Sequence, residues 1–508
     1  MNMTRPARRA KTEAFSLLFG DDFGEDFDNL INEENVIEGE EEQLEGLNLH
    51  VDDDGDALPI EMLEVMPVLD ECEYSDSEEE EILPLRQRIE FDDAIQYCDQ
   101  NVGADTNWQL INEEHVRGKI PAKNICRFEP GPKTGIHPTT EKESLEIYLD
   151  DIIEELVRYT NLAGRRIVAA CTGSQKAKKV WKPVSRPEME AFLGLHLIAG
   201  AYRAHHRQVK DLWSDVHGQP IFRATMSEDR FKAIKRCFRM DDPVRRDRSD
   251  KLAPVRYVWN LLQKSLTAAY TPGPYLTVDE QLLEFHGRVA FKQYIKTKPG
   301  KFGVKIFWIN DSCSSYALRG IVYTGGQTLE KKTTDEPFSE SVTLNLAEPF
   351  TNENRNITCD NWFTSVPLAQ KLLKKKTTLI GTIRSNRKFI PKEAKCREDR
   401  AKKSVKYYKT SDMILCSYMD KGNQPVLLLT TMHGEVPKED PKENKQPQLV
   451  RDYNATKSGT DNMDHMIRVF SSKRKCRRWP YSFFMNMLDV MALNAYIVFK
   501  YDHSQTNR

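Results

Sequence analysis

The stretch LTVDEQLLEFHGRVAFKQYIKTKPGKFGVKIFWINDS, Leu276–Ser312, decides the fold of this chain. Short runs rich in β-branched and aromatic residues lie in and beside it: YLTV at 275–278, VAFKQYI at 289–295, GVKIFWI at 303–309 and YALRGIVY at 316–323. Turn residues separate these runs, a pattern typical of antiparallel strands joined by short loops. We therefore predict a β-meander between residues 275 and 323.

Strands and helices are also predicted downstream of the meander. NITC at 356–359 and TLIGTI at 378–383 are predicted strands, with an amphipathic helix between them at about 364–375. Residues 388–448 are rich in Lys, Glu, Pro and Asp and contain the short strand runs MILCSY and VLLLTT, so we interpret them as an insertion. Helical patterning returns after Asn454 and continues to the end.

Upstream of the meander, the pattern changes to that of helices. Apolar residues recur at helical spacing across 143–270, which predicts a mostly helical segment. Ser185 is followed by Pro187 and Glu188, a pattern typical of a helix N-terminus, and Ser227 is a second candidate N-cap.

Charge is divided unevenly along the 508 residues. Asp21–Leu83 holds 26 acidic and no basic side chains, whereas residues 84–508 hold 70 basic and 50 acidic ones. Such an acidic segment repels itself and has few apolar residues, so residues 1–85 are predicted to be disordered. The positive remainder favours a polyanion such as nucleic acid as partner, although a solvated surface gives the same count.

Ten cysteines are scattered through the chain without a CxxC pair, so no zinc site is expected. Their number is typical of a reducing compartment. The sequence shows no run of 18 apolar residues and no apolar stretch after its N-terminus, so we predict neither a membrane span nor a secretory signal.

Four aspartates lie at predicted strand ends or on a predicted helix, where their carboxylates could bind metal ions together. Asp279 follows the run YLTV, Asp360 follows NITC, and Asp461 and Asp464 lie one turn apart on a predicted helix. Carboxylates suit hard Mg²⁺ ions, and two ions roughly 3.5–4 Å apart serve phosphoryl chemistry. This layout is that of an RNase H-like nuclease core. A carboxylate after a strand is also commonly a turn residue or helix cap, and position alone leaves both interpretations open.

Three sequence motifs, found in the same order along the chain as in a known family, favour the metal-binding interpretation of these aspartates. The opening stretch resembles the first catalytic motif of piggyBac transposases, and NITCDNWFTSVPLAQKLL at 356–373 resembles the second. YNATKSGTDNMDHM at 453–466, followed by KRKCRRWPYSFF at 473–484, is similar to the third. The resemblance covers about residues 140–500.

The resemblance implies an α/β fold: an RNase H-like catalytic core with an inserted domain, joined to a mainly helical dimerisation and DNA-binding domain. The expected boundaries are as follows: 1–85 disordered acidic region; 86–139 irregular linker; 140–273 helical domain, first part; 274–387 catalytic core, first part; 388–448 insertion domain; 449–470 catalytic core with the third aspartate; 471–508 helical domain, second part.

The resemblance also implies the chemistry. Asp279, Asp360 and Asp461 are the expected catalytic triad, binding two Mg²⁺ or Mn²⁺ ions with help from Asp464. The reaction implied is cut-and-paste transposition in the nucleus: strand nicking, hairpin formation and opening, then strand transfer at TTAA. The implied partners are double-stranded transposon ends and the TTAA target, with a homodimer as the assembly.

Basic side chains beside the three motifs are the candidate DNA-binding residues, because lysine and arginine neutralise phosphates. They are Lys296, Lys298, Lys301, Lys305, Arg384, Arg387, Lys388, Lys473, Arg474, Lys475, Arg477 and Arg478. The run KRKCRR is also a candidate nuclear localisation patch. Each cluster taken alone is more typical of a solvated surface, but the position of all three beside the motifs favours contact with DNA.

One departure from the family keeps a second function open. Many members end in a cysteine-rich zinc domain, whereas the final 90 residues here contain only Cys476. The alternative to transposase is therefore a domesticated nuclear DNA- or chromatin-binding protein without transposition activity, whose acidic tail recruits a protein partner. A general RNase H-like nuclease is a third interpretation, less economical because it leaves the helical and inserted segments without a role.

Overall fold

The computed structural model describes residues 107–111, 126, 128–170, 181–204, 206–326, 328–329, 336–398, 400–420, 424–436 and 446–506. The acidic region 1–85, predicted to be disordered, lies outside these residues, as does much of the predicted linker 86–139.

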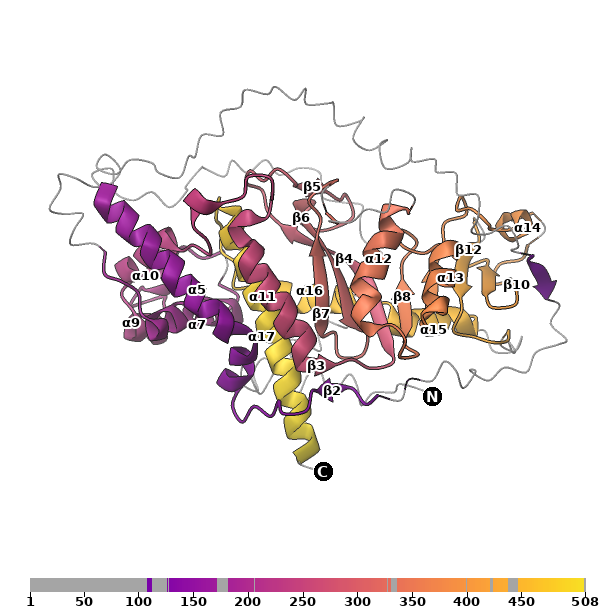
Figure 1. The fold of residues 1–508 in the computed structure, drawn as a ribbon, viewed down its shortest axis with the longest axis horizontal. Coiled ribbons are helices and arrows are strands. Elements are labelled where there is room, and N and C mark those ends of the chain that lie inside the picture. The colour runs from indigo at the N-terminus through magenta and orange to yellow at the C-terminus, as the bar shows by residue number, and fades with distance from the viewer. Residues whose placement is uncertain are drawn as a thin grey trace, which may run out of the picture.

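A mixed sheet forms the centre of the molecule (Figure 1). Strands β4 (Tyr275–Glu284), β6 (Phe302–Asp311) and β7 (Ala317–Val322) form an antiparallel meander. On the other side of β4, β8 (Asn356–Cys359) and β9 (Thr378–Thr382) run parallel to it. The resulting order, β9-β8-β4-β6-β7, is that of an RNase H-like core, as predicted.

Two expectations for the meander were wrong in detail. Asp279 does not follow its strand but lies inside it, because β4 continues to Glu284 by pairing with β6. The run VAFKQYI forms only the two-residue strand β5 (Gln293–Tyr294). Its apolar residues anchor a loop instead: Phe291 is buried and meets the ring of Trp479 edge-to-face.

The residues predicted to be an insertion extend the same sheet. β10 (Val405–Lys409), β11 (Ile414–Tyr418) and β12 (Val426–Thr430) pair in succession, and β12 runs antiparallel to β9. β1 (Gln109–Ile111) adds itself to β10. The segment 388–448 therefore continues the central sheet, and the domain boundaries expected above stay predictions.

Helices surround this sheet and form the rest of the molecule. In chain order they are α5 (Glu141–Ala170), α7 (Arg186–Ala201), α8 (Val209–Leu212), α9 (Pro220–Thr225), α10 (Glu228–Cys237), the 3₁₀ turn η4 (Pro243–Arg245), α11 (Ala253–Ala269), α12 (Phe338–Ala347), the 3₁₀ turn η5 (Glu348–Phe350), α13 (Val366–Lys374), α14 (Lys392–Lys395), α15 (Gln448–Thr456), α16 (Gly459–Val469) and α17 (Trp479–Thr506). A two-stranded ribbon pairs β2 (Gly131–Pro132) with β3 (Tyr270–Thr271). Ser185 and Ser227 cap α7 and α10 through their side chains, as predicted.

Helix α17 joins the two halves of the molecule. Figure 1 shows α5, α7 and α10 gathered at one end, with α11 and α17 between them and the sheet. α17 packs on α5, α11 and α16, while α16 lies on β4 and α11 on β7. By length and composition, Trp479–Tyr501 could cross a membrane, but most of its apolar window is buried in the fold, as in a core helix.

A buried carboxyl group on α17 makes the stability of the fold depend on pH. Asp489 is 4% exposed and accepts hydrogen bonds from Ser471 Oγ (3.0 Å) and Ser472 N (2.8 Å). Burial raises its pKa to about 7, against the opposing effects of those hydrogen bonds and of Lys473. The folded protein therefore holds this proton at pH values where the unfolded chain has released it.

Because the folded pKa lies above the unfolded one, stability is lost as pH rises towards 7. Between pH 5 and pH 8 this one group is expected to lower the free energy of unfolding by about 3 kcal/mol. The Asp489→Asn variant should lack that loss, since its amide does not ionise. Urea unfolding of both proteins at the two pH values measures the difference. Equal pH dependence in the two proteins would contradict the assignment.

Candidate active site

Two of the predicted catalytic aspartates lie at equivalent places on neighbouring chain segments of the sheet. The parallel register pairs Val278 of β4 with Cys359, the last residue of β8, so Asp279 inside β4 and Asp360 directly after β8 occupy the next position of each segment. Parallel strands lie about 4.8 Å apart. Asp360 Oδ1 also accepts hydrogen bonds from the amides of Trp362 (2.9 Å) and Phe363 (3.3 Å), so it does cap a turn as well.

Helix α16 brings the third and fourth aspartates over the same strands. Its first residue, Gly459, approaches β4 so closely that a Cβ there would lie 2.7 Å from Thr277 Oγ1. Thr460 Oγ1 donates to Asn310 Oδ1 of β6 at 2.8 Å, and Thr277 Oγ1 donates to the Thr456 carbonyl at 2.7 Å. The helix that carries Asp461 and Asp464 is therefore fixed against β4 and β6 at its N-terminus.

The carboxylates are close enough to affect one another's ionisation. The pKa of Asp279 is raised well above its usual value, first by burial and then by the charges of Glu280, Asp461 and Asp360. The pKa of Asp360 is raised by burial and by Glu280, against its two amide hydrogen bonds. Within the described part of the chain, no three His, Cys, Asp or Glu side chains stand close enough to hold one metal ion. The three predicted aspartates therefore interact through their charges but do not form a closed coordination shell among these residues.

A lysine lies at the edge of this carboxylate group. Lys298 Nζ is 3.4 Å from Asp461 Oδ1 and donates to the Glu280 carbonyl at 3.3 Å. Burial lowers its pKa, but the charges of Asp461, Asp279 and Glu280 outweigh that effect and leave the pKa raised. Lys298 is therefore protonated and supplies positive charge beside the triad.

Asp464 is held by a residue that the sequence analysis missed. Gln281 Nε2 donates to Asp464 Oδ1 at 2.8 Å, and Gln281 Oε1 accepts from Trp308 Nε1 at 3.0 Å. Gln281 stands two positions after Asp279 in β4, so both side chains leave the same face of the sheet. If Asp279 is taken to lie inside a strand, its spacing of two positions from Gln281 predicts that both side chains lie on the same face.

The predicted DNA-binding residues divide into exposed and embedded groups. The exposed ones are Lys296, Lys301, Arg384, Lys388, Lys475 and Arg477. Arg384 Nε donates to Asn361 Oδ1 at 3.0 Å, which places this arginine beside Asp360. Lys305 is embedded: its Nζ lies 3.6 Å from Glu280 Oε2 and 4.8 Å from the ring centres of Phe307 and Trp362.

Three predicted arginines serve the fold through backbone carbonyls. Arg474 donates to the Ala204 carbonyl at 3.0 Å and to Arg207, and Arg478 donates to the Lys235 carbonyl at 2.9 Å and to Phe238. Arg387 donates to the Trp362 carbonyl. The last carbonyls of a helix have no hydrogen-bond donor inside the helix, and Arg478 donates to those at the end of α10. Lys473 is half-buried, and burial lowers its pKa despite the charges of Asp489 and Asp464.

An RNase H-like sheet with one aspartate inside β4, one directly after the parallel strand β8 and two on a helix packed on β4 is the layout of an RNase H-like nuclease or polynucleotidyl transferase. A family model described as Transposase IS4 matches residues 146–496, most of the chain. Together with the relatives below, this places the chain in the piggyBac transposase family.

The relatives include both a solved structure and human proteins. The cryo-EM structure of a piggyBac transposase synaptic complex with hairpin DNA is 33% identical with a TM-score of 0.67, covering 75% of this chain and 79% of that one. Human PiggyBac transposable element-derived protein 3 is 26% identical over 381 residues, 71% of this chain and 61% of that protein. Human PiggyBac transposable element-derived protein 2 is 25% identical over 340 residues, or 63% and 56%. The chain thus spans about three fifths of these curated relatives.

Proposed function

We propose that this chain is a nuclear DNA transposase that performs metal-dependent cut-and-paste transposition. The steps are nicking at each transposon end, attack of the freed 3′-hydroxyl on the opposite strand to form a hairpin, hairpin opening, and strand transfer at TTAA. Asp279, Asp360 and Asp461 are the proposed catalytic residues, acting on double-stranded DNA in a homodimer. The observation that carries the proposal is that Asp360, directly after β8, and Asp461, on the helix packed on β4, lie close enough to Asp279 for their charges to act on it.

The donor set fits divalent metal ions. All the candidate ligands are carboxylate oxygens, which Mg²⁺ and Mn²⁺ prefer. Burial, together with the charges of Glu280, Asp461 and Asp360, raises the pKa of Asp279. Asp279, Asp360 and Asp461 would hold two ions, with Asp464 beside them. When bound, such ions activate the attacking oxygen and stabilise the leaving one.

The chain's own residues position the DNA for this chemistry. Arg384, held by Asn361 next to Asp360, and the exposed Lys296 and Lys301 on the loop before β6 would contact phosphates near the triad. Lys298 offsets part of the carboxylate charge, so a phosphate backbone approaches the triad with less repulsion. Binding of this kind weakens steeply with salt.

One observation favours the alternative, a domesticated nuclear DNA- or chromatin-binding protein. Lys298 forms an ion pair with Asp461, and the aspartates do not close into a metal shell among the described residues. A chain that binds DNA without cutting it is compatible with that arrangement. The human relatives are themselves named as transposable element-derived proteins.

An excision assay in cells separates the two functions. A reporter gene is interrupted by a TTAA-flanked element that carries the terminal repeats found beside this gene, and the full chain is expressed with it. Seamless restoration of the reporter is expected for a transposase. If the reporter stays silent while the purified protein still binds the repeats in low salt, the DNA-binding function is the correct one.

A further inference from the structure

A largely apolar cavity of about 420 Å³ lies among α5, α7, α16 and α17, apart from the proposed catalytic residues. Leucines and a phenylalanine from three helices line it: Leu145, Leu149, Leu193, Leu197, Leu493 and Phe499. Met466 and Ile467 of α16 complete one wall. Cavities of this size and lining accommodate apolar ligand groups.

Two features of the cavity wall indicate that the cavity is a binding site and not a packing defect. Gly194 stands inside α7, where glycine weakens a helix, yet a Cβ there would meet no atom within 4 Å. Gly194 therefore borders open space in the cavity. Ser144 Oγ faces the cavity, is buried, and has no hydrogen-bond partner among the described residues. A buried hydroxyl without a partner is costly unless a ligand supplies one.

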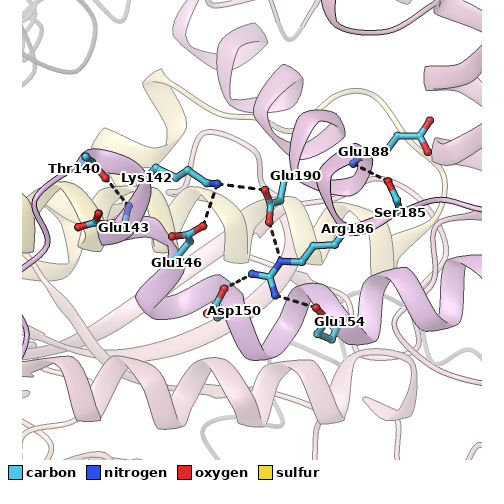
Figure 2. Close-up of polar contacts among 10 residues, drawn as sticks. All are labelled: Thr140, Lys142, Glu143, Glu146, Asp150, Glu154, Ser185, Arg186, Glu188 and Glu190. Atoms are coloured by element: carbon cyan, nitrogen blue, oxygen red, sulfur yellow. Dashed lines mark hydrogen bonds and ion pairs between the residues drawn. The ribbon is translucent and has the colours of Figure 1, made fainter.

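Acidic side chains outnumber basic ones at the rim of the cavity, and several of them pair with Lys142 and Arg186 (Figure 2). Four of its side chains are acidic, Glu141, Glu146, Asp150 and Glu190, against two basic ones, Lys142 and Arg186. Arg186 bonds Glu190 at 2.9 Å and also Asp150, and Lys142 lies 3.3 Å from Glu146 and 3.5 Å from Glu190. These ion pairs neutralise only part of the charge of the four acidic side chains. The occupant should therefore be basic as well as apolar.

We propose that residues 5–19 of this same chain, RPARRAKTEAFSLLF, dock in the cavity. Phe15, Leu18 and Phe19 have the i, i+3, i+4 spacing of a helix that lays one apolar face into a groove. The segment also carries Arg5, Arg8, Arg9 and Lys11 against one acid, and so complements the rim. The acidic stretch that follows it, Asp21–Leu83, has no basic residue and is unsuited to this rim.

The length of the chain permits this contact. Residues 1–20 lie outside the described residues, and 87 positions separate Phe19 from the next described residue, Asn107. Such a length spans up to about 290 Å when extended, far more than the fold requires. The docked segment would pack against Met466 and Ile467, two and three positions after Asp464 on the helix that carries Asp461. The proposal concerns docking alone and holds whether or not the protein cuts DNA.

Photocrosslinking in the full-length protein tests the proposal. A benzophenone amino acid replaces Leu18, and mass spectrometry locates the crosslinks after irradiation. We expect them on peptides from α5, α7 and α17 that line the cavity. Mixing isotopically heavy and light chains distinguishes contacts within one chain from contacts between copies. Crosslinks to other surfaces, or only between copies, would overturn the proposal.

Substitutions at Gly194 test the proposal by filling the cavity, and they should leave the fold intact because a side chain there enters open space. Gly194→Leu places a side chain in open space and should lower the crosslink yield at least tenfold, while Gly194→Ala should change it less than twofold. R8E/R9E should also lower the yield, and E141K/E146K should restore it in that background. Asp151→Lys, an exposed residue of α5 outside the cavity lining, is the matched control and should leave the yield unchanged. An undiminished yield in Gly194→Leu contradicts docking in this cavity.

Discussion

Replacing Asp360 with asparagine is expected to reduce excision by about 10³-fold, equivalent to about 4 kcal/mol of activation free energy. Asparagine keeps a side-chain oxygen that accepts the amide hydrogen bonds of Trp362 and Phe363, so the turn after β8 survives. The substitution removes the negative charge of Asp360, and divalent ions bind best to negatively charged oxygen ligands. The cell-based excision assay gives the ratio directly.

Two further variants separate chemistry from folding in that experiment. Asp360→Ala loses both the charge and the turn hydrogen bonds, so its free energy of unfolding should fall by a further ~1 kcal/mol relative to asparagine. Asp412→Ala changes an exposed aspartate in the turn between β10 and β11 and should leave excision at the wild-type level. If Asp360→Asn excises as well as wild type, Asp360 is a turn residue and nothing more.

The sequence was sufficient to predict the centre of the fold for a physical reason. The meander strands and NITC are buried on both faces or nearly so, and such strands appear as short apolar runs bounded by turn residues. Asp360 was correctly placed because NITC ends where its apolar run ends. Asp279 was predicted to follow its strand but lies inside it, because β4 continues through EQLLE. Polar and apolar residues mix there, and only the pairing with β6 defines the strand.

What the sequence could not show was which basic residues face outward. KRKCRR appears as one uniform patch, yet Arg474 and Arg478 turn inward to carbonyls of the α7–α8 region and α10, while Lys475 and Arg477 stay exposed. The acceptors lie some 240 to 270 positions away in the chain, so no local pattern reports them. In 388–448, the runs MILCSY and VLLLTT do form strands, β11 and β12, as predicted. Their attachment to the central sheet depends on the pairing of β12 with β9, which the local composition does not report.

Truncating Trp308 to alanine should lower the free energy of unfolding by about 3–5 kcal/mol, since it empties a large fully buried site. Trp308 is 0% exposed in β6, packs edge-to-face on Trp259 at 5.6 Å, and lies so close to Gly320 that a Cβ there would be 2.8 Å from its ring. Urea unfolding of the purified full-length protein measures the loss. Tyr257→Ala, which removes an aromatic side chain that is 55% exposed on α11, should change stability by no more than about 0.5 kcal/mol.

Trp308→Phe tests how the core supports the candidate site. Phenylalanine retains most of the apolar contacts but has no N–H for Gln281 Oε1, which then keeps only the Asn486 amide at 3.3 Å. Because Gln281 also holds Asp464, we expect a stability loss of about 1–2 kcal/mol together with a disproportionate fall in excision. A fall in excision no larger than the reduced amount of folded protein would mean that Asp464 is held in place without Trp308. A larger fall would establish that the sheet interior positions the fourth carboxylate through Gln281.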